Sequence, residues 1–121
     1  MLGTSLGVST SYLAKADANA LVFTFEGCPE TAKIAAENFE KQNIKNTSIT
    51  LGNFNLTLAQ KLKEIKTIDL AFIDGNHQKK PTIAYFEKCL EYANNDTIFV
   101  FDDIHWSDGM ESAWNYIKAH T

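Results

Sequence analysis

The feature that most constrains the fold is a regular alternation of short apolar segments with amphipathic ones. Each apolar segment is as long as a typical buried strand, and we predict strands at 20–25, 47–51, 68–73 and 97–101. The other segments carry apolar residues at helical spacing, and we predict helices at 9–18, 29–43, 57–65, 81–92 and from 108 onward. Near-continuous apolar strands separated by amphipathic helices indicate a parallel sheet covered on both faces. We therefore predict an α/β fold with three αβα layers and a mainly parallel sheet, formed by residues 1–121 as a single domain.

Local signals support three of the predicted helix starts. Pro29 suits the first position of a helix, because its missing N–H would have no partner there. Thr57 and Gln60 have the spacing of a capping box, and so do Asp108 and Glu111.

Composition excludes several classes of partner. The net charge of −4 and the pI near 5.3 argue against nucleic-acid binding, which needs a basic face. No apolar run approaches the roughly 20 residues of a membrane span, and no signal peptide is recognisable at the start. Cys28 and Cys89 are too few for a disulfide framework, so we expect free thiols in a cytoplasmic protein without membrane partners.

A glycine-containing turn precedes the first predicted helix. In parallel α/β folds such a turn lets the backbone approach a cofactor, and the helix N-terminus offers free N–H groups. We therefore predict cofactor contacts from Gly3, Thr4, Ser5 and Gly7. The same residues satisfy the G-x-S-x-G pattern of a serine nucleophile, but that site requires a preceding strand and a longer sheet.

Every predicted strand ends in polar residues, at the edge where parallel sheets bind ligands: Glu26, Asn53, Asp74, Asp102 and Asp103. Glu26 follows Gly3 by 23 residues, close to the spacing of about 20 at which an acidic side chain reaches a ribose diol. The alternative role for Glu26 is to cap the helix that begins near Pro29.

Asp74, Asp102 and Asp103 form a second group of candidate residues. Adjacent carboxylates repel each other unless a cation or a proton relieves them, and open oxygen ligands suit Mg²⁺. We predict a metal site at these three aspartates; in the alternative, Asp103 turns away and only Asp102 faces the site. His77 and His105 follow the aspartates closely and are candidates for a general base or a ligand, or for exposed loop residues without a role.

Two tryptophans near the C-terminus receive different predictions. Trp106 falls in a predicted loop and is the better candidate for lining a substrate pocket. Trp114 has the spacing of the buried face of the last helix, together with Met110, Ala113 and Ile117.

Taken together, these motifs resemble the class I S-adenosylmethionine-dependent methyltransferases, whose fold is Rossmann-like, over nearly the whole chain. Leu2–Gly7 is similar to the first motif of that family, and Phe25-Glu26 to the second, in which the acid binds the ribose hydroxyls of the cofactor. The resemblance places Asn53 near the adenine and adds Asp74 to the cofactor-binding residues. The segments 72–77 and 100–105 are similar to the strand ends that hold a divalent cation in metal-assisted O-methyltransferases. The implied catalytic residues are Asp74, His77 and His105.

The chain departs from the family pattern at both ends. Only Met1 and Leu2 precede the glycines, without the usual acidic residue, and the sequence stops at Thr121 before the usual C-terminal hairpin. We therefore expect a partial domain that lacks most of its first strand and the hairpin. In the family strand order the missing strand would separate the strands of Leu21 and Leu70 by roughly 10 Å and leave two unpaired edges. These edges would have to pair with each other or be covered in a homodimer, or else promote aggregation.

Three functions follow, from different classes. The first is transfer of a methyl group from S-adenosylmethionine to an oxygen of a small-molecule acceptor, with assistance by Mg²⁺ left open. The second is a truncated, non-catalytic domain that dimerises or binds a partner. The third is a nicotinamide dinucleotide-binding domain, which Glu26 also fits, although the turn lacks the third glycine of G-x-G-x-x-G.

Overall fold

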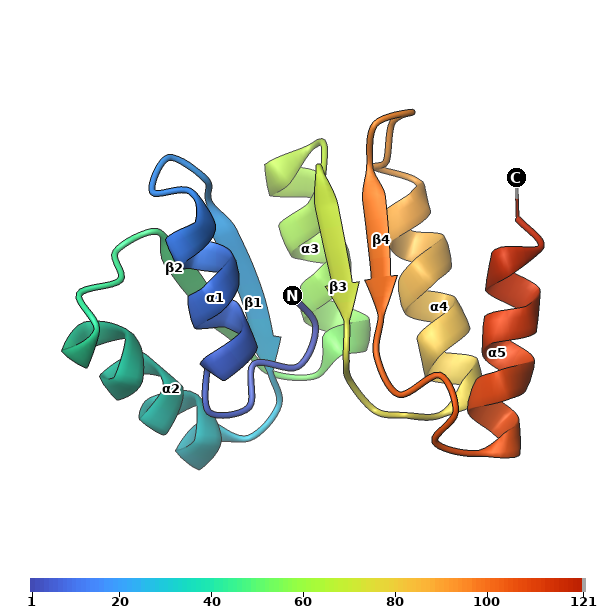
Figure 1. The fold of residues 1–121 in the computed structure, drawn as a ribbon, viewed down its shortest axis with the longest axis horizontal. Helices are drawn as coiled ribbons and strands as arrows, with labels where there is room; N and C mark the ends of the chain where they lie inside the picture. The colour runs from blue at the N-terminus through green and yellow to red at the C-terminus, as the bar shows by residue number, and fades with distance from the viewer. Residues whose placement is uncertain (121) are drawn as a thin grey trace. The chain divides into compact units, whose positions relative to one another are not determined.

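A computed structural model describes residues 1–120, in which helices and short strands alternate as the sequence predicts (Figure 1). The elements, in chain order, are α1 (Val8–Ala16), β1 (Val22–Glu26), α2 (Pro29–Lys41), β2 (Thr47–Leu51), α3 (Phe54–Ile65), β3 (Leu70–Ile73), α4 (Lys79–Leu90), β4 (Ile98–Phe101) and α5 (Asp108–Lys118). Every predicted strand and helix is present. Both strand pairings, β1 with β2 and β3 with β4, are parallel, which confirms the parallel α/β class.

Two predicted capping boxes, at α3 and at α5, differ from the structure because other residues act as caps. Helix α3 begins three residues before Thr57: Oδ1 of Asn53 accepts from the Asn55 amide at 2.9 Å, and the Thr57 hydroxyl donates to the Asn53 carbonyl at 3.0 Å. The predicted capping box at Thr57 is therefore wrong, since an Asn side chain satisfies the first turn equally well.

At α5 the N-cap is Ser107, whose hydroxyl accepts from the Met110 amide at 3.2 Å. Asp108 is instead the first helical residue, where its negative charge favours the positive end of the helix dipole. The predicted capping box of Asp108 and Glu111 is wrong as well.

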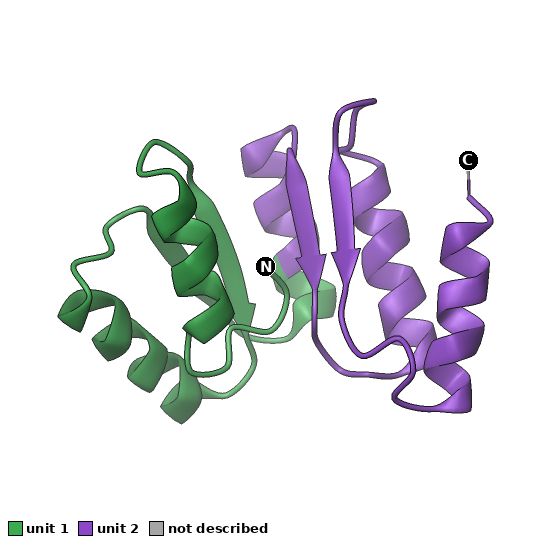
Figure 2. Cartoon of the chain, in the orientation of Figure 1, with its two compact units in different colours: residues 1–57 green, residues 58–121 purple. Residues whose placement is uncertain are grey.

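The chain divides into two compact units, residues 1–57 and residues 58–121, of which the second is described as far as residue 120 (Figure 2). The boundary falls within α3. Whether the two units form a single domain depends on how they are joined, and the single-domain prediction stays a prediction.

In the first unit β1 and β2 pair in register from Val22 with Thr47 to Glu26 with Leu51. The chain start also pairs with β1. Leu2 makes one parallel bridge to Phe25, the Phe25 amide donates to the Met1 carbonyl at 3.0 Å, and the Gly3 amide donates to the Phe25 carbonyl at 3.1 Å. The family pattern has a full strand before the glycines, and here Met1 to Gly3 supply one short stretch of it.

The core of the first unit contains a cluster of threonines, Thr4, Thr10 and Thr24, whose side chains are fully buried. The Thr24 hydroxyl lies 2.7 Å from that of Thr4 and 3.3 Å from that of Thr10. Buried hydroxyls cost stability unless they are hydrogen-bonded, and these three satisfy one another. The cluster links the glycine turn, α1 and β1.

One amide side chain holds the connection between α1 and β1. Asn46 Nδ2 donates to the carbonyls of Ala14, Asp17 and Ala20 at distances of 2.9–3.1 Å. One carbonyl of α1 and two of the loop that follows it are therefore held by the residue that immediately precedes β2.

In the second unit β3 and β4 pair in register from Leu70 with Ile98 to Ile73 with Phe101. Phe86 on α4 packs edge-on against Phe99 and Phe101, with ring centroids 5.3 and 5.9 Å apart. Helix α5 buries Met110, Ala113 and Ile117 as predicted. Trp114, predicted on the same face, is only half-buried and packs against Phe101 with ring centroids 5.8 Å apart. Within residues 1–120 no helix is both long enough and apolar enough to cross a membrane.

Candidate functional site

The glycine turn adopts a left-handed backbone at three positions, with φ values of 100° at Gly3, 49° at Ser5 and 87° at Gly7. Gly7 is the N-cap of α1. A Cβ atom at Gly7 would lie 2.7 Å from Cε1 of Phe39, closer than a real contact allows. Glycine is therefore required at Gly7 both by the backbone conformation and by the packing of α2.

The residues of this turn are not equally available to a ligand. The Thr4 side chain is used in the buried threonine cluster, so Thr4 could meet a cofactor only through its backbone. Ser5 is exposed, and its backbone amide is already bonded to Glu26. The turn thus offers the Ser5 hydroxyl and the first amides of α1, which have no partner inside a helix.

Glu26 ends β1 with both carboxylate oxygens engaged. Oε1 accepts from the Ser5 amide at 2.8 Å, and Oε2 accepts from the Cys28 amide at 3.0 Å. A carboxylate has about four acceptor positions, so capacity remains for two hydroxyl donors. Glu26 therefore joins the glycine turn to the start of α2 and can still accept from a diol.

Asn53, predicted to lie near an adenine, is exposed at the end of β2 and caps α3 through its side-chain oxygen. Its structural role is thus defined, and the cofactor contact stays a prediction.

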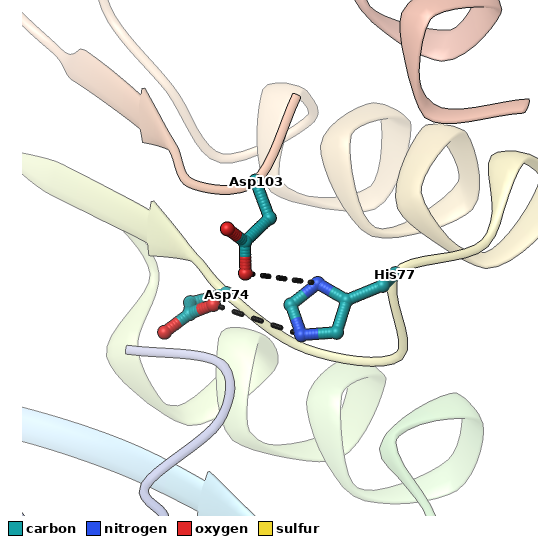
Figure 3. A group of neighbouring side chains, drawn as sticks. All are labelled: Asp74, His77 and Asp103. Carbon is teal, nitrogen blue, oxygen red and sulfur yellow. Dashed lines mark ion pairs between the residues drawn. The ribbon is translucent and has the colours of Figure 1, made fainter. Parts of the chain in front are cut away.

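In the second unit Asp74, His77 and Asp103 come together beyond the ends of β3 and β4 (Figure 3). His77 Nε2 lies 4.0 Å from Oδ1 of Asp74, and His77 Nδ1 lies 3.7 Å from Oδ2 of Asp103. One ligand atom from each residue can be chosen so that all three lie within 4.8 Å of one another. We call these three residues the Asp–His–Asp cluster.

The local backbone explains how the cluster forms. Asn76, His77 and Asp103 all have positive φ values, of 70°, 44° and 53°. Non-glycine residues pay a conformational cost in this region and adopt it where the surrounding structure demands it. The two turns that follow β3 and β4 are therefore shaped so that His77 and Asp103 face each other.

Burial raises the pKa of the Asp74 carboxyl above its usual range, and the neighbouring Asp102 carboxylate raises it further. His77 opposes this effect, and Asp103 adds to it. A bound cation would relieve this repulsion, because it favours the ionised form of each carboxylate.

Asp102 does not join the cluster, although the sequence predicts it as a metal ligand. Its Oδ1 accepts from the Asp103 amide at 2.8 Å, and its own amide donates to the Ile73 carbonyl at 3.2 Å. The structure thus places Asp102 in the turn and Asp103 toward His77, the reverse of the alternative considered for this pair.

The two histidines after the strands lie in different surroundings. His105 is exposed and pairs through Nδ1 with Oε1 of Glu111 at 3.0 Å, which directs it toward α5 rather than into the cluster. His77 stacks on Trp106, with ring centroids 5.0 Å apart and planes inclined by 23°. Trp106 remains 66% exposed, consistent with its prediction as a loop residue.

Nothing in the sequence pattern groups His77 with Asp74 and Asp103 in place of Asp102. The signal that was present is the spacing of His77 three residues after Asp74, in a segment with Gly75 and Asn76, residue types that tolerate a left-handed turn.

A surface groove of about 420 Å³ lies between α2 and β2, lined by Ala36, Phe39, Glu40, Asn43, Ile44, Lys45, Thr47 and Ile49. It contains none of the predicted site residues. The glycine turn with Glu26 and the Asp–His–Asp cluster are better candidates for the functional site than this groove. Converging polar groups and a perturbed pKa indicate a functional position more specifically than a surface cavity does.

Parallel strands, a left-handed glycine turn that opens a helix, and an acid at the end of the next strand define a Rossmann-like cofactor-binding fold. A family model described as a methyltransferase domain matches residues 1–104, and the chain belongs to this family.

Solved structures share the fold of this chain. An O-methyltransferase from Bacillus cereus, crystallised in complex with SAH, is 26% identical with a TM-score of 0.83; the match covers 98% of this chain and 60% of that one. Cofactor-bound Rv0187 from MTB shares the fold, with 24% identity, a TM-score of 0.85 and coverage of 98% and 59%. The chain has the class I methyltransferase fold and spans about 60% of the length of these relatives.

A protein of Acanthamoeba polyphaga mimivirus, R132, is 42% identical over 55 residues, which are 43% of this chain and 25% of the viral protein.

Proposed function

We propose that this chain is the cofactor-binding part of an S-adenosylmethionine-dependent O-methyltransferase that acts on a small molecule. The observation that carries the proposal is the engagement of Glu26, whose carboxylate joins the glycine turn to α2 and keeps acceptor capacity for a ribose diol. The match to the methyltransferase-domain family supports it, and so does the SAH complex of the Bacillus cereus relative.

In this proposal the first unit holds the cofactor. The Ser5 hydroxyl and the first amides of α1 face its polar groups, and Glu26 accepts from the ribose hydroxyls. Asn53 contributes at the end of β2. A nicotinamide dinucleotide is the weaker candidate, because the turn lacks the third glycine.

The second unit supplies the residues that would bind a divalent cation. The Asp–His–Asp cluster fits such an ion, because three donor atoms converge within 4.8 Å. Burial, and then the neighbouring Asp102 carboxylate, raises the pKa of Asp74, and a cation would offset both effects. When bound, the cation would lower the pKa of an acceptor hydroxyl. Asp74 and Asp103 would hold it, with Asp102 beside them, and we extend this assignment below.

The acceptor hydroxyl must also lose a proton before or during methyl transfer. Asp74 and His77 are the groups of the cluster able to accept it, because each carries an acceptor atom that faces the others. The exposed indole of Trp106, stacked on His77, offers a flat apolar surface beside these groups for the acceptor.

Isothermal titration with S-adenosylmethionine and with S-adenosylhomocysteine tests the cofactor part of the proposal. We expect saturable binding of both ligands, and no binding of NAD⁺ under the same conditions. Absence of heat at millimolar S-adenosylmethionine, with a folded protein by circular dichroism, would overturn it.

The competing function is a non-catalytic module that dimerises. Light scattering on the same sample measures the oligomeric state and separates the two functions. The module hypothesis predicts a dimer that binds no cofactor, so a monomer that binds the cofactor contradicts it. A dimer that fails to bind either methyl-donor ligand would favour the module.

A further inference from the structure

The position of His77 has a consequence for the metal, and the inference rests on the proposed metal-assisted function. Each ring nitrogen of His77 lies near one carboxylate of the cluster, at 4.0 Å from Asp74 and 3.7 Å from Asp103 (Figure 3). Both distances exceed a hydrogen bond, so the imidazole lies between the two acids without being bonded to either.

The spacing of the donor atoms suits a shared ion. Two ligands bound to one ion at about 2.1 Å can lie at most about 4.2 Å apart. Only one ring nitrogen can bind a given ion, so one of the two nitrogen–oxygen distances, 4.0 Å or 3.7 Å, applies, and either falls within that reach. The remaining separations among the three donor atoms are at most 4.8 Å, and closing that distance needs a movement of well under 1 Å. The His77 side chain is 30% exposed and the Asp103 side chain 40%, so an ion can enter from solvent.

Two features hold the imidazole in this place. The backbone of Asn76 and His77 is left-handed, which turns the chain back toward β4 after it leaves β3. Trp106 then stacks on the ring at 5.0 Å and limits its rotation. Ordering a side chain in advance lowers the entropic cost of binding, so His77 is prepared to act as a ligand.

We propose that His77 is a metal ligand together with Asp74 and Asp103, and that the site therefore prefers Co²⁺ or Zn²⁺ to Mg²⁺. Mg²⁺ is a hard cation that takes oxygen ligands, whereas imidazole nitrogen suits the later divalent ions. Asp102 is bonded through one carboxylate oxygen to the Asp103 amide, and it does not belong to the group of three residues whose donor atoms converge.

This assignment also affects the base. A nitrogen that ligates an ion has no lone pair left for a proton, and the second ring nitrogen is left to hydrogen-bond to a carboxylate oxygen, as in many metal sites. The proton of the acceptor hydroxyl then goes to the free oxygen of Asp74 or to solvent.

The test measures metal binding directly, without activity. Co²⁺ is titrated into the full chain and followed by its visible absorption and by quenching of Trp106 fluorescence, and Mn²⁺, Zn²⁺ and Mg²⁺ are then compared by calorimetry. We expect Co²⁺ and Zn²⁺ to bind at least tenfold more tightly than Mg²⁺. Trp106→Phe should remove the metal-dependent fluorescence change. The emission that remains in this variant comes from Trp114 on α5 and should not respond to the metal.

His77→Gln is the decisive variant, and His105→Gln is its matched control, because His105 also follows a strand but pairs with Glu111. We expect His77→Gln to weaken Co²⁺ binding by 10–100-fold, the usual scale for loss of a metal-site partner, and to leave the Mg²⁺ affinity nearly unchanged. His105→Gln should leave both affinities unchanged. Equal or tighter binding of Mg²⁺ in the unmodified chain, or an unaltered Co²⁺ affinity in His77→Gln, would overturn the proposal.

Two further measurements distinguish failure of the His77 proposal from failure of the proposed function. Circular dichroism and S-adenosylmethionine binding are measured on the same variants. Failure of cofactor binding with intact His77-dependent Co²⁺ binding overturns the methyltransferase proposal alone. Intact cofactor binding without any bound divalent ion overturns the His77 proposal alone.

Discussion

The backbone amide of Ser5 donates to Oε1 of Glu26 at 2.8 Å, so the acid that is expected to bind the ribose also fastens the glycine turn. Cofactor recognition and loop order therefore depend on the same carboxylate. A charged acceptor makes stronger hydrogen bonds than a neutral one, which suits a loop that must be rigid before the ligand arrives.

Replacing Glu26 by Gln should weaken S-adenosylmethionine binding by about 10–100-fold, because the amide NH₂ group cannot accept from a backbone amide and bonds to a charged group contribute about 1.5–3 kcal/mol. Calorimetry measures the change. Glu30→Gln, on the first turn of α2, is the control and should bind normally. Equal affinities for the two variants would count against Glu26 as the ribose ligand.

Thr24→Val should destabilise the protein by about 1–3 kcal/mol, because it leaves the buried hydroxyls of Thr4 and Thr10 without their shared partner. Urea denaturation measures the free energy of unfolding. Thr50→Val, at a half-buried position on β2, should change it by less than about 0.5 kcal/mol. A loss of similar size in both variants would mean that the threonine cluster contributes nothing specific.

Gly7→Ala should lower the free energy of unfolding by about 1–3 kcal/mol, because alanine is strained at a φ of 87° and its Cβ would overlap Phe39. Gly109→Ala is the matched control: in α5 the nearest atoms to an added Cβ lie 3.6 and 3.7 Å away, so alanine should be neutral or slightly stabilising. Thermal unfolding of the two variants distinguishes the positions. A Gly7→Ala protein as stable as the parent would contradict the packing described here.

The two cysteines should differ sharply in reactivity. Cys28 is exposed, whereas Cys89 is buried, and burial raises the pKa of its thiol to about 11. An aromatic disulfide reagent at pH 8 should therefore modify one thiol quickly in the native protein and two in denaturant. Cys28→Ser should remove the fast phase; if a fast phase persists in that variant, Cys89 is accessible.

Tyr116 should titrate later than an ordinary tyrosine. Its hydroxyl donates to Oε1 of Glu87 at 2.6 Å, and this bond raises the pKa of the phenol because deprotonation breaks it. A group whose pKa is raised on folding stabilises the protein fully below its unfolded pKa, near 10, and loses that contribution as the pH rises through the folded value. Alkaline absorbance titration should show a late phase that Tyr116→Phe and Glu87→Gln each remove and that Tyr12→Phe retains.

The sequence determined element type well, because hydrophobic periodicity reports burial directly. The strand predicted at 47–51 has those bounds in the structure, and α2 begins at Pro29 as expected. Helix starts were less predictable where several residues could cap. Asn53 and Ser107 took that role from Thr57 and Asp108, and only the backbone path decides which side chain reaches the first amides.

For the candidate site, the strand ends could be predicted, but the direction of their side chains could not. Asp102 and Asp103 are adjacent, and a left-handed backbone at Asp103 decides which of them faces His77. Likewise, Thr4 looked like a ligand residue because of its motif, while its hydroxyl is used by a partner 20 residues away in the chain. Such pairings depend on tertiary contacts that no local pattern encodes.

The bonds from Asn46 to three carbonyls constrain both the length and the conformation of the α1–β1 connection. An inserted or deleted residue there would move at least one carbonyl out of reach and leave a polar group to be solvated afresh. Peptide tags, reporter insertions and new chain ends are therefore better placed in the exposed turn at residues 94–96, which is closed by its own local bonds.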